Sequence, residues 1–155
     1  MKLKEGKKAP EFCLNDKDGN SVCLKDYKNK WVILYFYPKD NTPGCTKEAI
    51  EFTEEINFFK KNGAEVIGIS SDSEKSHTKF MNKHDLKVTL LSDIEKDVLK
   101  LYGVWQLKKM FGKEYHGVVR STFLINPDGI IDKIWEKVKV NGHVEDVVCS
   151  LKDNI

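Results

Sequence analysis

The hydrophobic pattern along the chain predicts strands and helices in alternation. Residues 31–37 are a continuous apolar and aromatic run, typical of a strand buried on both faces. After a short polar loop, four apolar residues recur at the spacing of one helical face: Ala49, Phe52, Ile56 and Phe59. A second apolar run follows at residues 65–70. Together these segments predict a strand–helix–strand unit with parallel strands and a right-handed crossover.

The remaining pattern adds a hairpin at the amino terminus and a strand pair near the carboxyl terminus. Residues 11–24 alternate apolar and polar around Asp18-Gly19, a strong turn signal, which predicts a β-hairpin. Further elements are expected as a helix at 73–83, a strand at 87–91, a helix after a Ser92/Glu95 capping box, strands at 118–125 and 130–140, and a helix from 142. Residues 104–117 have no clean period, so we expect a long irregular and functional loop there.

This order of elements defines the fold class. It predicts an α/β protein in which helices flank a mixed central sheet, preceded by an N-terminal β-hairpin. A βαβ unit followed later by ββα is the plan of the thioredoxin-like fold. The 155 residues suffice for a single domain spanning 1–155. A nucleotide-binding α/β protein is disfavoured, because the strand-to-helix turn DNTPGC matches neither phosphate-binding glycine motif.

Composition removes several classes of partner. The 26 basic and 24 acidic residues give a formal net charge of +2, so nothing favours nucleic acid. The amino terminus has no apolar core of signal-peptide length, and no apolar run approaches the ~18 residues that span a bilayer. We therefore expect a cytoplasmic protein that does not contact a membrane, as a monomer or weak homodimer.

The four cysteines favour a reducing compartment, because they are too few and too scattered for a disulfide scaffold. In the hairpin register that pairs Phe12 with Leu24, Cys13 lies opposite Cys23 on the non-core face. Two interpretations of this pair stay open, small packed side chains or a redox-active pair. The four histidines show no ligand spacing, so we expect surface histidines and neither metal nor cofactor.

Cys45 has the sequence context of a reactive thiol. Thr42 is the expected N-cap of the helix and Pro43 its first residue, which places Cys45 in the first turn. There the unpaired N–H groups and the helix dipole favour a thiolate. Taken singly, an inert packed cysteine and a threonine that only caps the helix remain alternatives.

Two separated segments carry a resemblance to a known family. The motif Pro38-x-x-x-Thr42-x-x-Cys45, together with Arg120 in VVRSTFLINPDG, resembles the peroxiredoxins. YFYPKDNTPGCTKEA and YGVWQLKKMFGKEYHG are similar to the PrxQ subgroup, also called bacterioferritin comigratory protein. The resemblance covers nearly the whole chain. It implies a thioredoxin-fold peroxidase that reduces hydrogen peroxide and alkyl hydroperoxides without metal or haem, with electrons from thioredoxin or a similar thiol donor.

The chemistry of peroxide reduction suits these residues. Cys45 is expected to attack the peroxide, and Thr42 to offer its hydroxyl to the sulfur and to a peroxide oxygen. Arg120 is expected to hold thiolate and peroxide together, and the ring of Pro38 to limit water. For Glu48 two readings stay open, a partner that orients the arginine or an exposed helix residue.

The chain departs from its family at the expected resolving position. Many PrxQ members carry a second cysteine five residues after the first, where this sequence has Ile50. Cys149, the Cys13 and Cys23 pair, or an external thiol remain to resolve a sulfenic acid, and we favour the external thiol.

A non-enzymatic peroxide sensor or interaction module remains an alternative function. A dithiol–disulfide oxidoreductase is disfavoured, because that exchange needs two close cysteines at the helix start and only one is there. An apolar lip or core packing is expected for Trp105, Met110, Phe111 and Tyr115.

Overall fold

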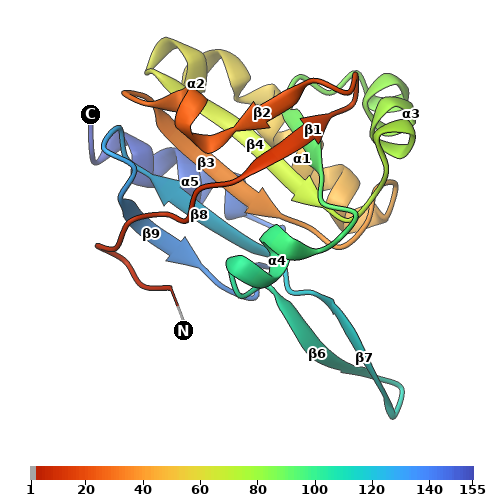
Figure 1. Cartoon of the computed structure of the whole chain (residues 1–155). Helices are drawn as coiled ribbons and strands as arrows, with labels where there is room; N and C mark the ends of the chain where they lie inside the picture. Colours follow the sequence, from red (N-terminus) through yellow and green to blue (C-terminus); the bar gives the residue numbers. More distant parts are fainter. Residues whose placement is uncertain (1–2) are drawn as a thin grey trace.

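The computed structural model describes residues 3–155. Its main feature is a seven-stranded sheet in the order β2-β1-β5-β4-β3-β8-β9 (Figure 1). The strands of this sheet are β1 (Cys13–Asp16), β2 (Ser21–Cys23), β3 (Trp31–Phe36), β4 (Ala64–Ser70), β5 (Thr89–Ser92), β8 (Ser121–Ile125) and β9 (Ile131–Trp135). β3, β4 and β5 run parallel, whereas β8 is antiparallel to β3, and β1 to β5. The sheet is therefore mixed, as predicted.

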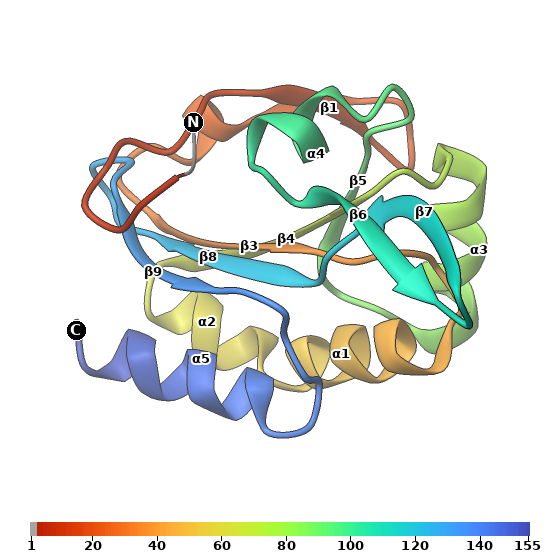
Figure 2. The ribbon, with the colours of Figure 1, turned by 90° about the horizontal axis from the view of Figure 1, so that it is seen from below.

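Helices cover both faces of the sheet (Figure 2). They are α1 (Pro43–Glu54), α2 (Ile56–Lys61), α3 (Glu74–His84), α4 (Asp97–Leu101) and α5 (His143–Lys152), with a short 3-10 helix at Leu24–Tyr27. Residues of α1, α2, α3 and α5 share one hydrophobic cluster, and those of α4 join the cluster on the opposite face. The predicted thioredoxin-like arrangement of a sheet between helical layers is confirmed.

The central strand β3 serves both cores because its side chains alternate between the two faces. Ile33 and Tyr35 enter the cluster beneath α1, and Val32, Leu34 and Phe36 enter the cluster on the α4 face. An element buried on both sides reads as a continuous apolar run, so the sequence identified it correctly.

Tyr35 depends on a glycine in the neighbouring strand. Gly68 is its register partner in β4, and a Cβ built there would lie 2.7 Å from Tyr35 Cζ and 2.8 Å from Leu90 Cδ2. A Gly68→Ala variant is expected to lose about 1–3 kcal/mol of unfolding free energy, because the aromatic ring must shift in a packed core. Urea denaturation measures this, with Glu65→Ala in the same strand as control. Equal stability of the two variants would contradict it.

The N-terminal hairpin has the predicted register, with Cys13 opposite Cys23 and Leu14 opposite Val22. Its cysteines, however, are joined in a disulfide rather than standing as two neighbouring thiols. Antiparallel pairing brings opposed side chains close enough for this bond, which the low cysteine count had argued against.

The prediction of an irregular loop at 104–117 is wrong. Residues there form a second hairpin, β6 (Trp105–Met110) with β7 (Lys113–Val118), which projects from the body (Figure 1). Most of its side chains are exposed on both faces, so no apolar alternation marked it in the sequence. Phe111 at the tip is 98% exposed, which excludes core packing for this residue.

Further boundaries differ from the prediction, and the strand expected at 130–140 already ends at Trp135. α4 begins at Asp97 and not after a Ser92/Glu95 capping box, because Ser92 ends β5 and the carboxylate of Asp93 accepts from Leu99 N at 2.8 Å. The strand expected at 118–125 is divided, since β7 ends at Val118 and β8 begins at Ser121. Arg120 therefore lies at the junction between these two strands, directly before β8.

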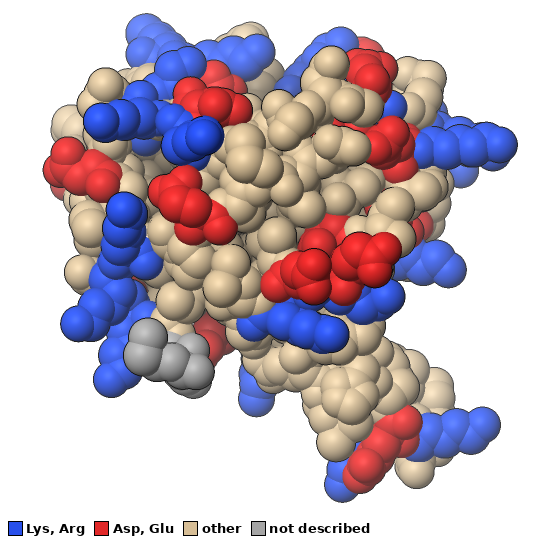
Figure 3. Space-filling model, viewed as in Figure 1, with Lys and Arg blue, Asp and Glu red and all other residues tan. Residues whose placement is uncertain are grey.

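Within residues 3–155, no helix combines the length and the apolar character needed to cross a membrane. Figure 3 shows lysine and acidic side chains interspersed over the face in view.

Candidate active site

Cys45 lies where the sequence predicted, in the first turn of α1. Thr42 is the N-cap residue with extended backbone, and Pro43 is the first helical residue. The loop before it leaves the carboxyl end of β3, so strand and helix together fix the position of the sulfur. The residue is only 1% exposed and belongs to the core cluster of that face. The thiol is thus held in a water-poor setting.

The guanidinium of Arg120 reaches Cys45 across 75 residues of sequence. Its Nη2 donates to Cys45 Sγ at 3.2 Å, and its Nη1 donates to Glu48 Oε1 at 2.6 Å. The sheet register explains this meeting, because Ser121 pairs with Phe36 at the end of β3 that leads into the site loop. Arg120 precedes Ser121 and therefore stands beside the start of α1. The expected approach of arginine and cysteine is present.

Glu48 is the orienting partner of the arginine and not an exposed helix residue. It is 0% exposed. Burial raises the pKa of its carboxyl to about 7, although the charge and hydrogen bond of Arg120 oppose the shift. Its Oε2 has no hydrogen-bond partner within the described residues. The carboxylate thus changes charge near neutral pH while it holds the guanidinium.

Thr42 does not yet make the predicted contact with the sulfur. Its Oγ1 donates to Lys39 O at 2.8 Å, and a hydroxyl has one proton to donate. In this state the hydroxyl cannot donate to Cys45 or to a peroxide oxygen as well, so those contacts require its rotation. Pro38 lies half-buried at the end of β3, next to the same loop.

Gly44 is a residue that the sequence did not single out. A Cβ at this position would lie 3.2 Å from Arg120 Nη2, so any side chain here would press on the guanidinium. A glycine inside the first turn of a helix is unfavourable for helix formation, and that cost was the available signal.

Two of the four histidines expected on the surface are buried. His77 is 0% and His143 5% exposed. Burial lowers the pKa of His143 to about 4, and its Nε2 lies 2.8 Å from Thr122 Oγ1. His77 precedes Phe80 by three residues and shares its helical face, which is the sequence signal for burial. Its partners are Asp40, in the loop before Thr42, and Leu91 in β5, and both are described below.

The other cysteines stand away from Cys45. Cys149 is free and exposed on α5. Cys13 and Cys23 are bonded to each other at the sheet edge, and β1 is three strands from β3, roughly 14 Å at ~4.8 Å a strand. Ile50, at the position of the usual resolving cysteine, is half-buried on α1. The described residues therefore place no second thiol beside the first turn of α1.

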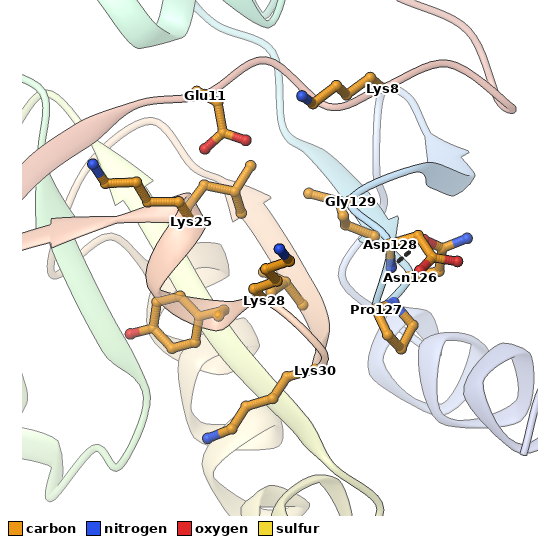
Figure 4. Close-up of a pocket in the computed structure, with 13 residues that line it drawn as sticks. Lys8, Glu11, Lys25, Lys28, Lys30, Asn126, Pro127, Asp128 and Gly129 are labelled. Atoms are coloured by element: carbon orange, nitrogen blue, oxygen red, sulfur yellow. Dashed lines mark hydrogen bonds between the residues drawn. The ribbon is translucent and has the colours of Figure 1, made fainter.

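A basic hollow of about 240 Å³ lies elsewhere on the molecule (Figure 4). Lys8, Lys25, Lys28 and Lys30 surround it together with the turn at residues 126–129. It adjoins Val32 at the start of β3 and Ile125 at the end of β8, whereas Cys45 follows the end of β3. This hollow is thus separate from the site at Cys45.

Comparison with known proteins gives a consistent result. The model of the AhpC/TSA family matches residues 6–134. The chain is 48% identical to peroxiredoxin Bcp of Bacillus subtilis over 153 residues, which cover 99% of this chain and 98% of that protein. It is 41% identical to peroxiredoxin Bcp of Escherichia coli, with coverage of 98% and 97%.

Solved structures agree with these relatives. PrxQ of Xylella fastidiosa, solved as a cysteine-to-serine mutant, superposes with a TM-score of 0.94 at 37% identity and covers 99% of this chain and 98% of its own. The bacterioferritin comigratory protein of Xanthomonas campestris, studied for alkyl peroxide reduction, gives 0.88 at 38% identity, with coverage of 92% and 91%. The chain belongs to the AhpC/TSA family, and it is a peroxiredoxin of the Bcp/PrxQ kind, a thiol-dependent peroxidase.

Proposed function

We propose that Cys45 is the thiolate that attacks hydrogen peroxide and alkyl hydroperoxides, with Arg120, Thr42 and Pro38 completing its site. The observation that carries this proposal is the 3.2 Å contact between Arg120 Nη2 and Cys45 Sγ in a site from which water is largely excluded. A charge-assisted bond to sulfur favours the thiolate, which is the nucleophilic form.

The chemical step requires only these groups. The thiolate sulfur attacks the hydroxyl oxygen of the hydroperoxide, an S–O bond forms and the O–O bond breaks. Cys45 becomes a sulfenic acid, and the second oxygen leaves as an alkoxide, or as hydroxide from hydrogen peroxide, which takes a proton from solvent. Arg120 is positioned to stabilise the charge that develops on this leaving oxygen, and Thr42 offers a hydroxyl once it rotates away from Lys39.

The sulfenic acid must then meet a thiol, and we favour an external donor. Ile50 cannot supply one, Cys149 faces solvent on α5, and Cys13 and Cys23 are bonded to each other. Thioredoxin or a similar small dithiol protein fits the need, because condensation of the sulfenic acid with its first thiol releases water and its second thiol releases Cys45.

We also infer a single domain spanning 1–155. The support is one seven-stranded sheet that joins strands from both ends of the chain, and two cores that share β3. A cytoplasmic location fits an enzyme that depends on reduced thiol donors.

Peroxide consumption by wild type, Cys45→Ser and Cys149→Ser tests the proposal, with thioredoxin, glutaredoxin and glutathione offered in turn. We expect Cys45→Ser to lose turnover with every donor, because no other thiol lies beside Arg120 in the described structure, and Cys149→Ser to keep the wild-type rate. Residual turnover in Cys45→Ser would refute the role of this residue. A wild type that oxidises once and does not cycle would instead identify a peroxide sensor.

A further inference from the structure

A buried acid–base pair joins the loop before α1 to α3. Asp40 lies in this loop, between Pro38 and Thr42, and His77 lies on α3. Their side chains are 1% and 0% exposed, and His77 Nδ1 lies 2.8 Å from Asp40 Oδ2. The peroxide chemistry derived above uses neither residue.

The hydrogen bonds of Asp40 and His77 give a partner to every polar atom of the two side chains. Asp40 Oδ1 accepts from the hydroxyl of Tyr37 at 2.6 Å, and Oδ2 accepts from Ser76 Oγ at 2.8 Å. His77 Nε2 lies 3.0 Å from the carbonyl oxygen of Leu91, which can only accept. Both ring nitrogens thus lie within hydrogen-bond distance of an oxygen atom, so the ring is held at both ends.

The pair ties the site loop to two other elements. Through His77 the carboxylate of Asp40 is joined to α3 and, by way of Leu91, to β5. The backbone is held as well, since Asp40 N donates to Asp72 Oδ2 at 2.8 Å. The loop is therefore anchored at one residue by both its side chain and its main chain.

This anchor is directly continuous with the threonine of the site. The peptide group between Lys39 and Asp40 accepts from Thr42 Oγ1 through its oxygen and donates to Asp72 through its N–H. Any displacement of Asp40 moves that peptide group, the hydroxyl of Thr42 and the start of α1 together.

We propose that Asp40 and His77 are positioning residues, which hold Thr42 and the first turn of α1 in place against Arg120 for the attack on peroxide. This rests on the proposed function of Cys45 and Thr42. Neither residue touches the peroxide. A buried hydrogen-bonded pair suits the task, because its directional bonds specify one loop position, whereas apolar side chains would fill the space without specifying it.

The kinetic test measures the rate constant for oxidation of Cys45 by hydrogen peroxide in His77→Gln, Asp40→Asn and the double variant. The double variant leaves no buried charge without its partner and guards against loss of fold. We expect the double variant to react about 10–100-fold more slowly than wild type, because small displacements of reacting groups are costly. His84→Gln, on the same helix, is the control and should keep the wild-type rate.

Repeating the measurement in a Thr42→Val protein separates an effect on positioning from an effect on stability. If the pair acts through Thr42, the double substitution costs little further rate in Thr42→Val, so the two effects are not additive. Fully additive losses would overturn the proposal, and so would a wild-type rate in a folded double variant. If Cys45→Ser loses turnover but the double variant of Asp40 and His77 reacts at the wild-type rate, this inference fails and the proposed function stands.

Nuclear magnetic resonance gives an independent readout on the unaltered protein. We expect the imidazole N–H proton that bonds Leu91 O to be protected from solvent exchange, because His77 is buried and its ring is held at both nitrogens. Exchange as fast as in a free histidine would show that the pair does not hold the loop, and would overturn the proposal.

Discussion

Replacing Arg120 with glutamine is expected to slow the reaction of Cys45 with hydrogen peroxide by about 10²–10³-fold, the usual effect of losing one donor aimed at developing charge. Arg120 contributes two bonds, to Cys45 Sγ and to Glu48 Oε1, from one planar group. Arg120→Lys should recover only part of the rate, because an ammonium keeps the charge but not the fork. Stopped-flow oxidation at pH 7 measures all three proteins.

The control for charge is Lys47→Gln, since Lys47 is an exposed cation on α1, the helix that carries Cys45. It should react at the wild-type rate. Because Arg120→Gln leaves Glu48 buried without its partner, the Arg120→Gln, Glu48→Gln double variant is the control for folding, and it should remain slow while regaining stability. Arg120 is also the only arginine in the sequence, so an arginine-specific reagent should inactivate the enzyme by a single modification. Unchanged kinetics in Arg120→Gln would contradict the proposed site.

The second large effect concerns stability and pH. Burial raises the pKa of Glu48 to about 7 in the folded protein from 4.5. At a pH between these two pKa values, Glu48 is protonated in the folded state but not in the unfolded chain. Proton binding by Glu48 therefore stabilises the fold fully below pH 4.5, and this stabilisation is lost as the pH rises through 7. The full contribution is about 3 kcal/mol.

Glu48→Gln removes this dependence because glutamine does not titrate. Urea denaturation at pH 5 and pH 8 should show the wild type losing about 2–3 kcal/mol more than the variant over that interval. Other titrating groups act on both proteins alike and cancel in the comparison. Glu54→Gln, an exposed position on the same helix, should keep the wild-type pH dependence. Parallel pH dependence in wild type and Glu48→Gln would show that the carboxyl is already charged at pH 5.

The fold was largely predictable because its main elements carry local signals. β3 and β4 are continuous apolar runs, α1 starts with a proline after its cap, and Gly63 follows α2 with positive φ. The β6–β7 hairpin gave no such signal, since exposed side chains show no periodicity. α4 was misplaced because Asp93 caps it from a distance of six residues rather than by a local motif.

The site was predictable in its residues but not in its contacts. Thr42 and Cys45 lie within one turn, so local rules placed them. That Glu48 is buried against Arg120, and that His77 is buried against Asp40, follows only from how distant elements pack. The disulfide of Cys13 and Cys23 likewise depends on the two strands that bring the sulfurs together.

By itself the sequence determined an α/β chain with a cysteine in the first turn of a helix, because hydrophobic periodicity, capping and turn chemistry act between near neighbours. The tertiary structure alone decided what surrounds that sulfur. Arg120 comes from 75 residues away because β8 runs antiparallel to β3, and Asp40 meets His77 because α3 packs beside the same strand end. Burial then strengthens these contacts, since charged and polar groups removed from water interact strongly with the few partners that remain.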